Sequence, residues 1–317
     1  MENKTNTVKE LIIIAGPTAT GKSDLAVALA KEIGGEVISA DSVQVYRGLD
    51  IGSAKLTPEE MQGIPHHLID VLDPEEPFNI TIFQKMAKDA IHEIRSRGHV
   101  PILCGGTGFY IQSVLYDIEF SEEAGGPYRE ELEKAAAEGR GEELYEQLRA
   151  VDPASCEKIH PNNIKRVIRA LEYYHETGRP ISEHNEEQRA REAAYDAAFF
   201  VLNDERARLY ERIDRRVDRM IEAGLVEEVR RLKAAGVPRH TTSMQGLGYK
   251  EIYAYLEGEC SLEEAIDAIK RGSRHFAKRQ LTWFHREEDT VWFDIGRYKD
   301  PCREICEEIL KLITLPA

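Results

Sequence analysis

Short apolar runs alternate with amphipathic segments near both ends of the chain. Residues 11–15 form an apolar run of strand length, and Leu25, Leu29 and Ile33 then recur every four residues, as on one face of a helix. The same two patterns predict further strands at 36–40, 68–72, 100–104, 198–203 and 291–295, and further helices at 81–97, 205–232, 261–286 and 301–312. Strands that alternate with helices predict an α/β fold around a parallel sheet.

The middle of the chain has a different pattern. Between residues 120 and 197 the apolar positions recur at helical spacing only, in segments separated by Gly139, Pro153 and Pro161. We therefore predict an all-helical insertion domain at 120–197 between two parts of the core, 1–119 and 198–317. A chain of 317 residues exceeds the usual size of one domain, which fits a core with an insertion.

A phosphate-binding loop joins the first predicted strand to the first predicted helix. Residues 16–23 read Gly-Pro-Thr-Ala-Thr-Gly-Lys-Ser, a complete G-x-x-x-x-G-K-[ST] motif. Gly16 and Gly21 allow backbone angles closed to other residues, so that successive N–H groups face phosphate oxygens. Lys22 supplies a charge for the terminal phosphate, and the hydroxyl of Ser23 is placed to bind Mg²⁺. The loop predicts a di- or triphosphate ligand without identifying it.

Polar residues follow two more predicted strands. Asp41 comes directly after 36–40, and residues beyond the carboxyl end of a strand face the ligand crevice of an α/β sheet. It is a candidate for water-mediated metal binding or proton abstraction, and the alternative is a capping or Asx-turn aspartate. Strand 100–104 leads into three glycines around Thr107, which we interpret as a close backbone approach to a ligand. NTPases usually carry an aspartate after such a strand, and its absence after Cys104 disfavours ATP hydrolysis.

The charge distribution changes the picture of possible partners. The net charge of −15 argues by itself against nucleic acid, yet residues 270–286 hold six Lys or Arg and no acid. In a chain with 57 acidic residues, this segment predicts a surface for a polyanion. Lys165, Arg166 and Arg169 form a second group on a predicted helix, where simple solvation of the helix is an equally good explanation.

Composition indicates a globular protein of the cytoplasm without a membrane partner. The chain is 42% apolar and 31% charged, its apolar runs are of strand length, and residues 1–10 are polar. Five cysteines form neither a C-x-x-C pair nor a zinc pattern. His66 and His67 point to opposite sides of an extended chain, so we expect packing or hydrogen bonding there and no metal site.

Six motifs, in order along nearly the whole chain, resemble those of the tRNA dimethylallyltransferases, also called tRNA isopentenyltransferases. They are the phosphate loop, Asp41-Ser-Val-Gln44, Gly52-Ser-Ala-Lys55, Gly105-Gly-Thr-Gly108, Lys165-Arg166-x-x-Arg169 and Lys278-Arg-Gln280 with Trp283. The bacterial members are the better match, because the C-terminal zinc finger of eukaryotic members is missing. Lys165 stands where glutamine is common in the family.

The resemblance implies a P-loop NTPase-like core and a chemical activity. A dimethylallyl group is expected to pass from dimethylallyl diphosphate to the 6-amino group of the adenosine on the 3′ side of the tRNA anticodon, with Mg²⁺ as cofactor. The enzyme is expected to act as a monomer, and the target base is expected to leave its stack to reach the site.

The resemblance also implies residue roles. Asp41 would take the proton from the amine, and Thr107 would hydrogen-bond at the reacting end. The diphosphate would be held by Gly16, Pro17, Thr18, Ala19, Thr20, Gly21, Lys22 and Ser23, with Arg216 as an added clamp. The tRNA would be contacted by Asp41, Ser42, Val43, Gln44, Lys165, Arg166, Arg169, Ser243, Gln245, Gly246, Lys250, Arg274, Lys278, Arg279 and Gln280.

Two other functions use part of the same pattern. An ATP-dependent kinase of a nucleoside or small molecule would share the phosphate loop and an aspartate after the second strand, but it leaves the acid-free segment at 270–286 unexplained. A non-catalytic RNA-binding or nucleotide-sensing protein would not need Asp41 at a strand end.

Overall fold

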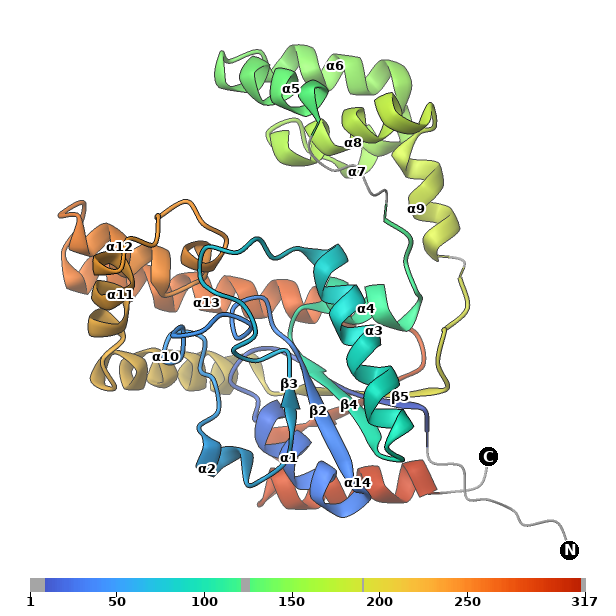
Figure 1. Ribbon diagram of the computed structural model, residues 1–317, viewed down its shortest axis with the longest axis vertical. Helices are drawn as coiled ribbons and strands as arrows, with labels where there is room; N and C mark the ends of the chain where they lie inside the picture. The colour runs from blue at the N-terminus through green and yellow to red at the C-terminus, as the bar shows by residue number, and fades with distance from the viewer. Residues whose placement is uncertain (1–8, 121–125, 190, 315–317) are drawn as a thin grey trace, which may run out of the picture. The chain divides into compact units, whose positions relative to one another are not determined.

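The computed structural model describes residues 9–120, 126–189 and 191–314. The chain divides into two compact units, which we call the core unit (1–115 with 194–317) and the helical unit (116–193). Figure 1 shows the strands gathered in the core unit and only helices in the other. The helical unit begins at 116 and ends at 193, compared with the 120–197 that the sequence pattern predicts.

The described strands of the core unit form one parallel sheet in the order β3-β2-β4-β1-β5-β6, which confirms the predicted α/β class. Their bounds are β1 Leu11–Ala15, β2 Gly35–Ala40, β3 His66–His67, β4 Val100–Gly105, β5 Ala197–Asn203 and β6 Thr290–Asp294. The strand predicted at 68–72 is wrong. His66 and His67 pair with β2 instead, and the positive φ angles of Leu68 and Asp70 end the extended segment.

Helices cover both faces of the sheet. Ile12 and Ile14 of β1 pack with Leu25 of α1 and Ile305 of α14 in one core cluster. The intervening Ile13 points to the opposite face, where α3 and α4 contact the strands. The bounds in this unit are α1 Lys22–Ile33, α2 Pro58–Met61, α3 Ile80–Ser96, α4 Gly108–Leu115, α10 Arg206–Glu222, α11 Leu225–Ala234, α12 Tyr249–Leu256, α13 Leu262–Phe284, α14 Pro301–Thr314, and the 3-10 turns η1 Ser243–Gln245 and η2 Ile295–Arg297.

Local signals set the ends of several helices. Gly224, at φ 102°, divides the predicted 205–232 helix into α10 and α11. At the start of α13 the hydroxyl of Ser261 accepts from Glu264 N–H while the Glu264 carboxylate accepts from Ser261 N–H, which is a capping box. Gly248 precedes α12, and Tyr249 and Lys250 form its first turn.

The helical unit has its own core. Its helices are α5 Pro127–Ala137, α6 Gly141–Val151, α7 Pro153–Lys158, α8 Ile164–Thr177 and α9 Ile181–Arg189. Leu148 of α6 packs with Val167 and Leu171 of α8, so the apolar stripes that predict these helices meet in the structure. None of the helices within the described residues combines the length and the apolar character that a membrane crossing requires.

Candidate functional site

Three loops with predicted site residues leave the sheet at one edge. The register pairs both Ala15 and Ala40 with Gly105, so β1, β2 and β4 end side by side. The phosphate loop, Asp41 and Thr107 follow these three strands directly, at the carboxyl edge where α/β sheets bind ligands. The sequence patterns that predict the strands therefore also predict that these groups lie together.

The phosphate loop has the backbone that its motif predicts. Gly16 and Gly21 have φ angles of 140° and 83°, and a Cβ on Gly16 would lie 2.3 Å from the carbonyl oxygen of Leu202. Lys22 begins α1 and its Nζ donates to the carbonyl of Pro17 at 2.7 Å, inside the loop. Burial lowers the pKa of Lys22 to about 8, although the residue is only partly buried.

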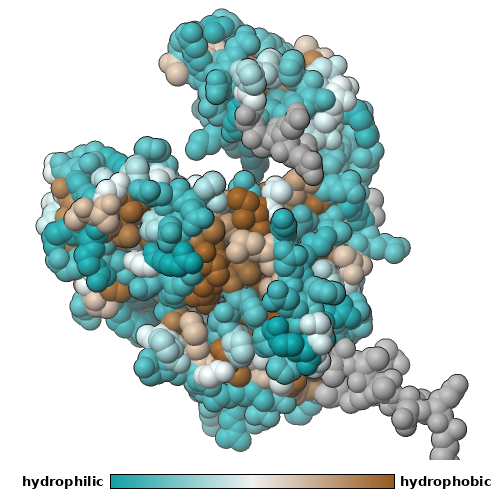
Figure 2. All heavy atoms as spheres, in the orientation of Figure 1, coloured by the Kyte–Doolittle hydropathy of each residue, from teal (hydrophilic) through white to brown (hydrophobic). Residues whose placement is uncertain are grey.

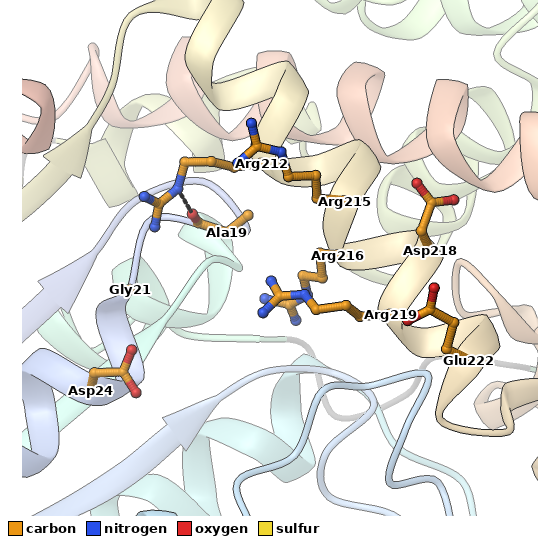
Figure 3. Close-up of a pocket in the computed structure, with 9 residues that line it drawn as sticks. All are labelled: Ala19, Gly21, Asp24, Arg212, Arg215, Arg216, Asp218, Arg219 and Glu222. Atoms are coloured by element: carbon orange, nitrogen blue, oxygen red, sulfur yellow. Dashed lines mark hydrogen bonds between the residues drawn. The ribbon is translucent and has the colours of Figure 1, made fainter.

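An arginine-rich pocket of about 680 Å³ opens beside the phosphate loop. Figure 3 shows Arg216 and Arg219 of α10 pointing toward the loop, while Nε of Arg212 donates to the carbonyl of Ala19 at 2.8 Å. Its lining residues are Ala19, Gly21, Asp24, Arg212, Arg215, Arg216, Asp218, Arg219 and Glu222. The arginine that the resemblance singles out thus lies at the loop, and the spacing of Arg212, Arg216 and Arg219 on one helix face could have identified its neighbours.

Asp41 combines the two interpretations that its sequence position left open. Its Oδ1 accepts hydrogen bonds from the N–H groups of Val43 (2.8 Å) and Gln44 (3.2 Å), which is an Asx-type turn. Within the described residues Oδ2 has no hydrogen-bond partner, and the charges of Lys22 and Arg216 interact with this carboxylate. The turn therefore fixes one oxygen and leaves the other available for chemistry.

Two of the glycines around Thr107 are required by packing within the protein. A Cβ on Gly105 would lie 2.3 Å from the carbonyl oxygen of Ala40, and one on Gly108 would lie 2.2 Å from the ring of Trp283. These glycines let the turn pack against β2 and α13, and the predicted close approach to a ligand stays a prediction. Thr107 stays partly exposed at the strand end.

Gln280 connects the phosphate loop to this turn. Its Oε1 accepts from the N–H of Thr18 at 3.1 Å and its Nε2 donates to the carbonyl of Gly106 at 2.9 Å. The side chain is 5% exposed, so we reassign Gln280 from the predicted tRNA contact to an internal link between two loops of the site. Because it uses the Thr18 N–H, this donor of the predicted phosphate cradle is directed at α13.

Other residues predicted to contact tRNA also have internal partners. Ser243 is fully buried and its hydroxyl donates to the carbonyl of Pro74 at 2.6 Å, so we reassign it to the fold. Gln44 is partly buried, and its amide joins Ser39 to the 53–54 loop. The exposed residues are Gln245, Lys278 and Arg279 in the core unit and Lys165 and Arg166 in the helical unit, while Ser42, Val43, Gly246, Lys250, Arg274 and Arg169 are partly buried.

Two cations of the acid-free segment 270–286 form ion pairs with acidic residues of α10. Lys270 pairs with Asp218 at 2.6 Å and Arg274 with Asp214 at 2.5 Å, across the contact between α13 and α10. In the helical unit, Arg169 pairs with the buried Glu172 at 2.9 Å. Part of the predicted RNA-binding charge is thus neutralised within the protein, by two acids that lie far from residues 270–286 in the sequence.

The residues at the phosphate loop fit a magnesium ion in their chemistry. The hydroxyl of Ser23 and the carboxylates of Asp24 and Asp41 offer hard oxygen donors near the loop, the type that Mg²⁺ prefers. Among the described residues no three His, Cys, Asp or Glu side chains are grouped to hold a metal, and Mg²⁺ commonly takes one or two protein oxygens together with substrate phosphates. The five cysteines, all within the described residues, are free thiols.

Comparisons with known protein families and sequences all find isopentenyl or dimethylallyl transferases. The family model described as IPP transferase matches residues 44–287, and a model described as isopentenyl transferase matches residues 9–74. A tRNA dimethylallyltransferase of Lachnoclostridium phytofermentans is 57% identical over 308 residues, covering 97% of this chain and 98% of that protein.

Solved structures agree with the sequence comparison. A full-length tRNA isopentenylpyrophosphate transferase of Bacillus halodurans superimposes with a TM-score of 0.72 at 45% identity, covering 96% of each chain. A eukaryotic dimethylallyltransferase acting on tRNA superimposes with a TM-score of 0.82 at 30% identity, covering 95% of this chain and 78% of that one.

Proposed function

This chain belongs to the IPP transferase family, and from that premise we propose that it transfers a dimethylallyl group from dimethylallyl diphosphate to tRNA. The acceptor is the 6-amino group of the adenosine on the 3′ side of the anticodon. The observation that carries the proposal is the alignment of β1, β2 and β4, which brings the phosphate loop, Asp41 and Thr107 to one edge of the sheet.

The reaction forms a bond between the amine nitrogen and the allylic carbon and breaks the bond between that carbon and a diphosphate oxygen. The diphosphate leaves with the electron pair of the broken bond. Lys22, Arg216 and the N–H groups of the phosphate loop other than that of Thr18 stabilise the charge that develops on it. The nucleophile is the amine, so no water has to be activated.

The nitrogen loses one proton as the new bond forms. Oδ2 of Asp41 accepts this proton, while the turn through Oδ1 fixes the direction of the carboxylate. The hydroxyl of Thr107, next to Asp41 along the sheet edge, donates a hydrogen bond at the reacting end. We propose Mg²⁺ as the cofactor; the hydroxyl of Ser23 would help to hold it, and it would supply charge neutralisation for the diphosphate.

The acceptor base has to leave the anticodon loop, because an adenine within a stack does not reach the edge of a sheet. Lys278 and Arg279 are exposed on α13 and supply phosphate contacts, and Phe109, 41% exposed beside Trp283, offers a ring for stacking. Figure 2 shows hydrophobic side chains gathered above the carboxyl ends of the strands on an otherwise hydrophilic face. Lys165 and Arg166 of the helical unit are further candidates for contacts with tRNA phosphates. We also propose that the protein is a monomer that acts in the cytoplasm.

One assay tests the proposal against the kinase alternative. Purified protein is incubated with bulk tRNA and Mg²⁺, with either labelled dimethylallyl diphosphate or γ-labelled ATP. We expect label in RNA from the first donor and none from the second. Transfer from ATP to any acceptor, with no transfer from dimethylallyl diphosphate, would contradict the proposal.

A further inference from the structure

Glu228 of α11 is a buried carboxylate with no part in the chemistry above. It is 1% exposed, and its Oε2 accepts hydrogen bonds from the N–H groups of Asp50 (3.1 Å) and Ile51 (2.8 Å). Its Oε1 accepts from the N–H of Gly52 (3.1 Å) and from the hydroxyl of Tyr249 (2.7 Å). Four neutral donors, three of them consecutive main-chain N–H groups, thus converge on one carboxylate and form an anion nest.

The nest fixes the conformation of the 50–54 loop. The ring of Tyr249 packs so closely on Gly52 that a Cβ there would lie 2.5 Å from it. Within the loop, Ser53 Oγ donates to the carbonyl of Leu49 at 2.6 Å, and Ala54 N–H donates to the carbonyl of Ile51 at 3.0 Å. Glu228 therefore joins a loop between β2 and β3 to two helices that lie far away in the sequence.

This loop is connected to Asp41 by one side chain. Nε2 of Gln44 donates to the carbonyls of Ser53 (3.2 Å) and Ala54 (3.4 Å), and its Oε1 accepts from the hydroxyl of Ser39 at 2.9 Å. The N–H of the same Gln44 donates to Oδ1 of Asp41 at 3.2 Å. The turn that directs Asp41 is thus held by Gln44, and Gln44 is held by the loop that Glu228 fixes.

We propose that Glu228 is a positioning residue for the transfer reaction, acting through the 50–54 loop and Gln44 on the direction of the Asp41 carboxylate. The inference rests on the proposed function, because it concerns the proton acceptor of that reaction. Glu228 contacts neither the phosphate loop nor the reacting atoms. We therefore expect it to affect proton removal from the acceptor amine and not binding of the donor diphosphate.

The substitution Glu228→Gln tests the role with little change of volume. An amide has one acceptor oxygen, and its NH₂ group must face at least one of the main-chain N–H groups in either orientation. We expect kcat to fall roughly ten- to hundredfold, the scale associated with small displacements of catalytic groups, while KM for dimethylallyl diphosphate changes by less than about threefold. Glu227→Gln, on the exposed side of the same helix and paired with Arg230, is the matched control and should leave kcat unchanged.

A double-mutant cycle separates positioning from general support of the fold. If Glu228 acts through Asp41, then Glu228→Gln in an Asp41→Asn background should lower kcat by no more than about twofold further. The same full loss in both backgrounds would overturn the proposal. Tyr249→Phe removes one donor and keeps the ring against Gly52, so the same cycle with this variant, expected to lower kcat about two- to fivefold, decides the question if Glu228→Gln does not fold.

Failure of this inference differs from failure of the proposed function. If the unmodified protein transfers no dimethylallyl label to tRNA, the proposed function itself is wrong. If it does, the ratios within the cycle decide the role of Glu228 alone.

Discussion

A carboxylate lies near each end of β2, and the two differ in how many of their oxygens are hydrogen-bonded within the protein. Glu36, near the amino end, is 2% exposed and accepts hydrogen bonds from Arg97 (2.8 Å), His67 (2.7 Å) and His99 (2.6 Å). Asp41, directly after the carboxyl end, uses one oxygen in a local turn and keeps the other without a hydrogen-bond partner among the described residues.

The difference separates a carboxylate that stabilises the fold from one that is available to a substrate. Burial acts to raise the pKa of Glu36, but the hydrogen bonds from Arg97, His67 and His99 outweigh it and lower the pKa to about 2. His67 thereby confirms the predicted hydrogen-bonding role of the histidine pair. Every oxygen of Glu36 is occupied, so no capacity remains for chemistry.

The largest effect is expected at Asp41. Asp41→Asn keeps an oxygen for the turn but removes the proton acceptor, so kcat for prenyl transfer should fall by about two decades or more, the upper part of the general-base range. KM for both substrates should stay near that of the unmodified enzyme, because the base acts only as the new bond forms. Steady-state transfer of labelled dimethylallyl groups measures the change.

Glu36→Gln on the same strand is the matched control for that experiment. It should retain kcat within about threefold, since it leaves the carboxyl edge untouched. The assignment of different roles to Asp41 and Glu36 would be wrong if Asp41→Asn keeps kcat within tenfold of the unmodified enzyme, or if Glu36→Gln loses as much activity as Asp41→Asn.

A smaller effect is expected at Lys22, which holds the donor. Lys22→Ala removes a charged hydrogen-bond donor from the diphosphate and should raise KM for dimethylallyl diphosphate roughly ten- to hundredfold, with tRNA affinity unchanged. Because burial lowers the pKa of Lys22 to about 8, the cation loses its proton as the pH rises through that value. kcat/KM for the donor should therefore fall above pH about 8.

Lys22→Arg provides the control for the pH dependence. A guanidinium stays charged throughout this range, so the decrease above pH about 8 should disappear even if the absolute rate is lower. Equal loss of tRNA affinity in Lys22→Ala would show that the phosphate loop does not act on the donor alone.

The next effect concerns stability at Glu36. Glu36→Gln removes the charge and keeps only one acceptor oxygen for the three partners. Because Arg97 and His99 are about half exposed, we expect the cost to be about 1–2 kcal/mol at pH 7. The pKa of Glu36 is lowered in the folded state from 4.5, so its stabilisation is complete above pH 4.5 and is lost as the pH falls toward 2.

Urea unfolding over a pH series measures this prediction. Both tryptophans, Trp283 and Trp292, lie in the core unit, so their fluorescence follows the part of the chain that contains Glu36. The difference in unfolding free energy between the unmodified protein and Glu36→Gln should narrow below pH 4.5. A difference that stays constant down to pH 3 would contradict the assignment of Glu36 as the stabilising carboxylate.

The sequence predicted what is local and missed what depends on distant partners. The phosphate loop and the position of Asp41 at a strand end follow from contiguous residues, and so does the basic segment. The internal roles of Ser243 and Gln280 could not be predicted, because their partners lie 169 and 174 residues away in the chain. The strand at 68–72 was wrong for the same reason, since pairing with β2 selects His66 and His67 and no local pattern reports it.

The cations of α13 also differ in whether a partner within the protein occupies them. Lys270 and Arg274 pair with Asp218 and Asp214 of α10, whereas Lys278 and Arg279 are exposed and form no ion pair within the described residues. Arg279 instead lies over the ring of Phe276, 5.6 Å from its centroid. We expect only the second pair to displace counterions from tRNA phosphates.

Two double variants test this smallest expected effect. Lys278→Gln with Arg279→Gln should weaken tRNA binding at low salt and reduce the slope of log affinity against log salt by roughly 0.7–0.9 for each contact removed. Lys270→Gln with Arg274→Gln should leave that slope unchanged and lower the melting temperature, because it leaves Asp214 and Asp218 without their partners. Filter binding of tRNA over a salt series, with binding of dimethylallyl diphosphate as the control, distinguishes the pairs. If the slope of log affinity against log salt is the same for the two variants, the ion pairs with α10 do not determine which cations contact tRNA phosphates.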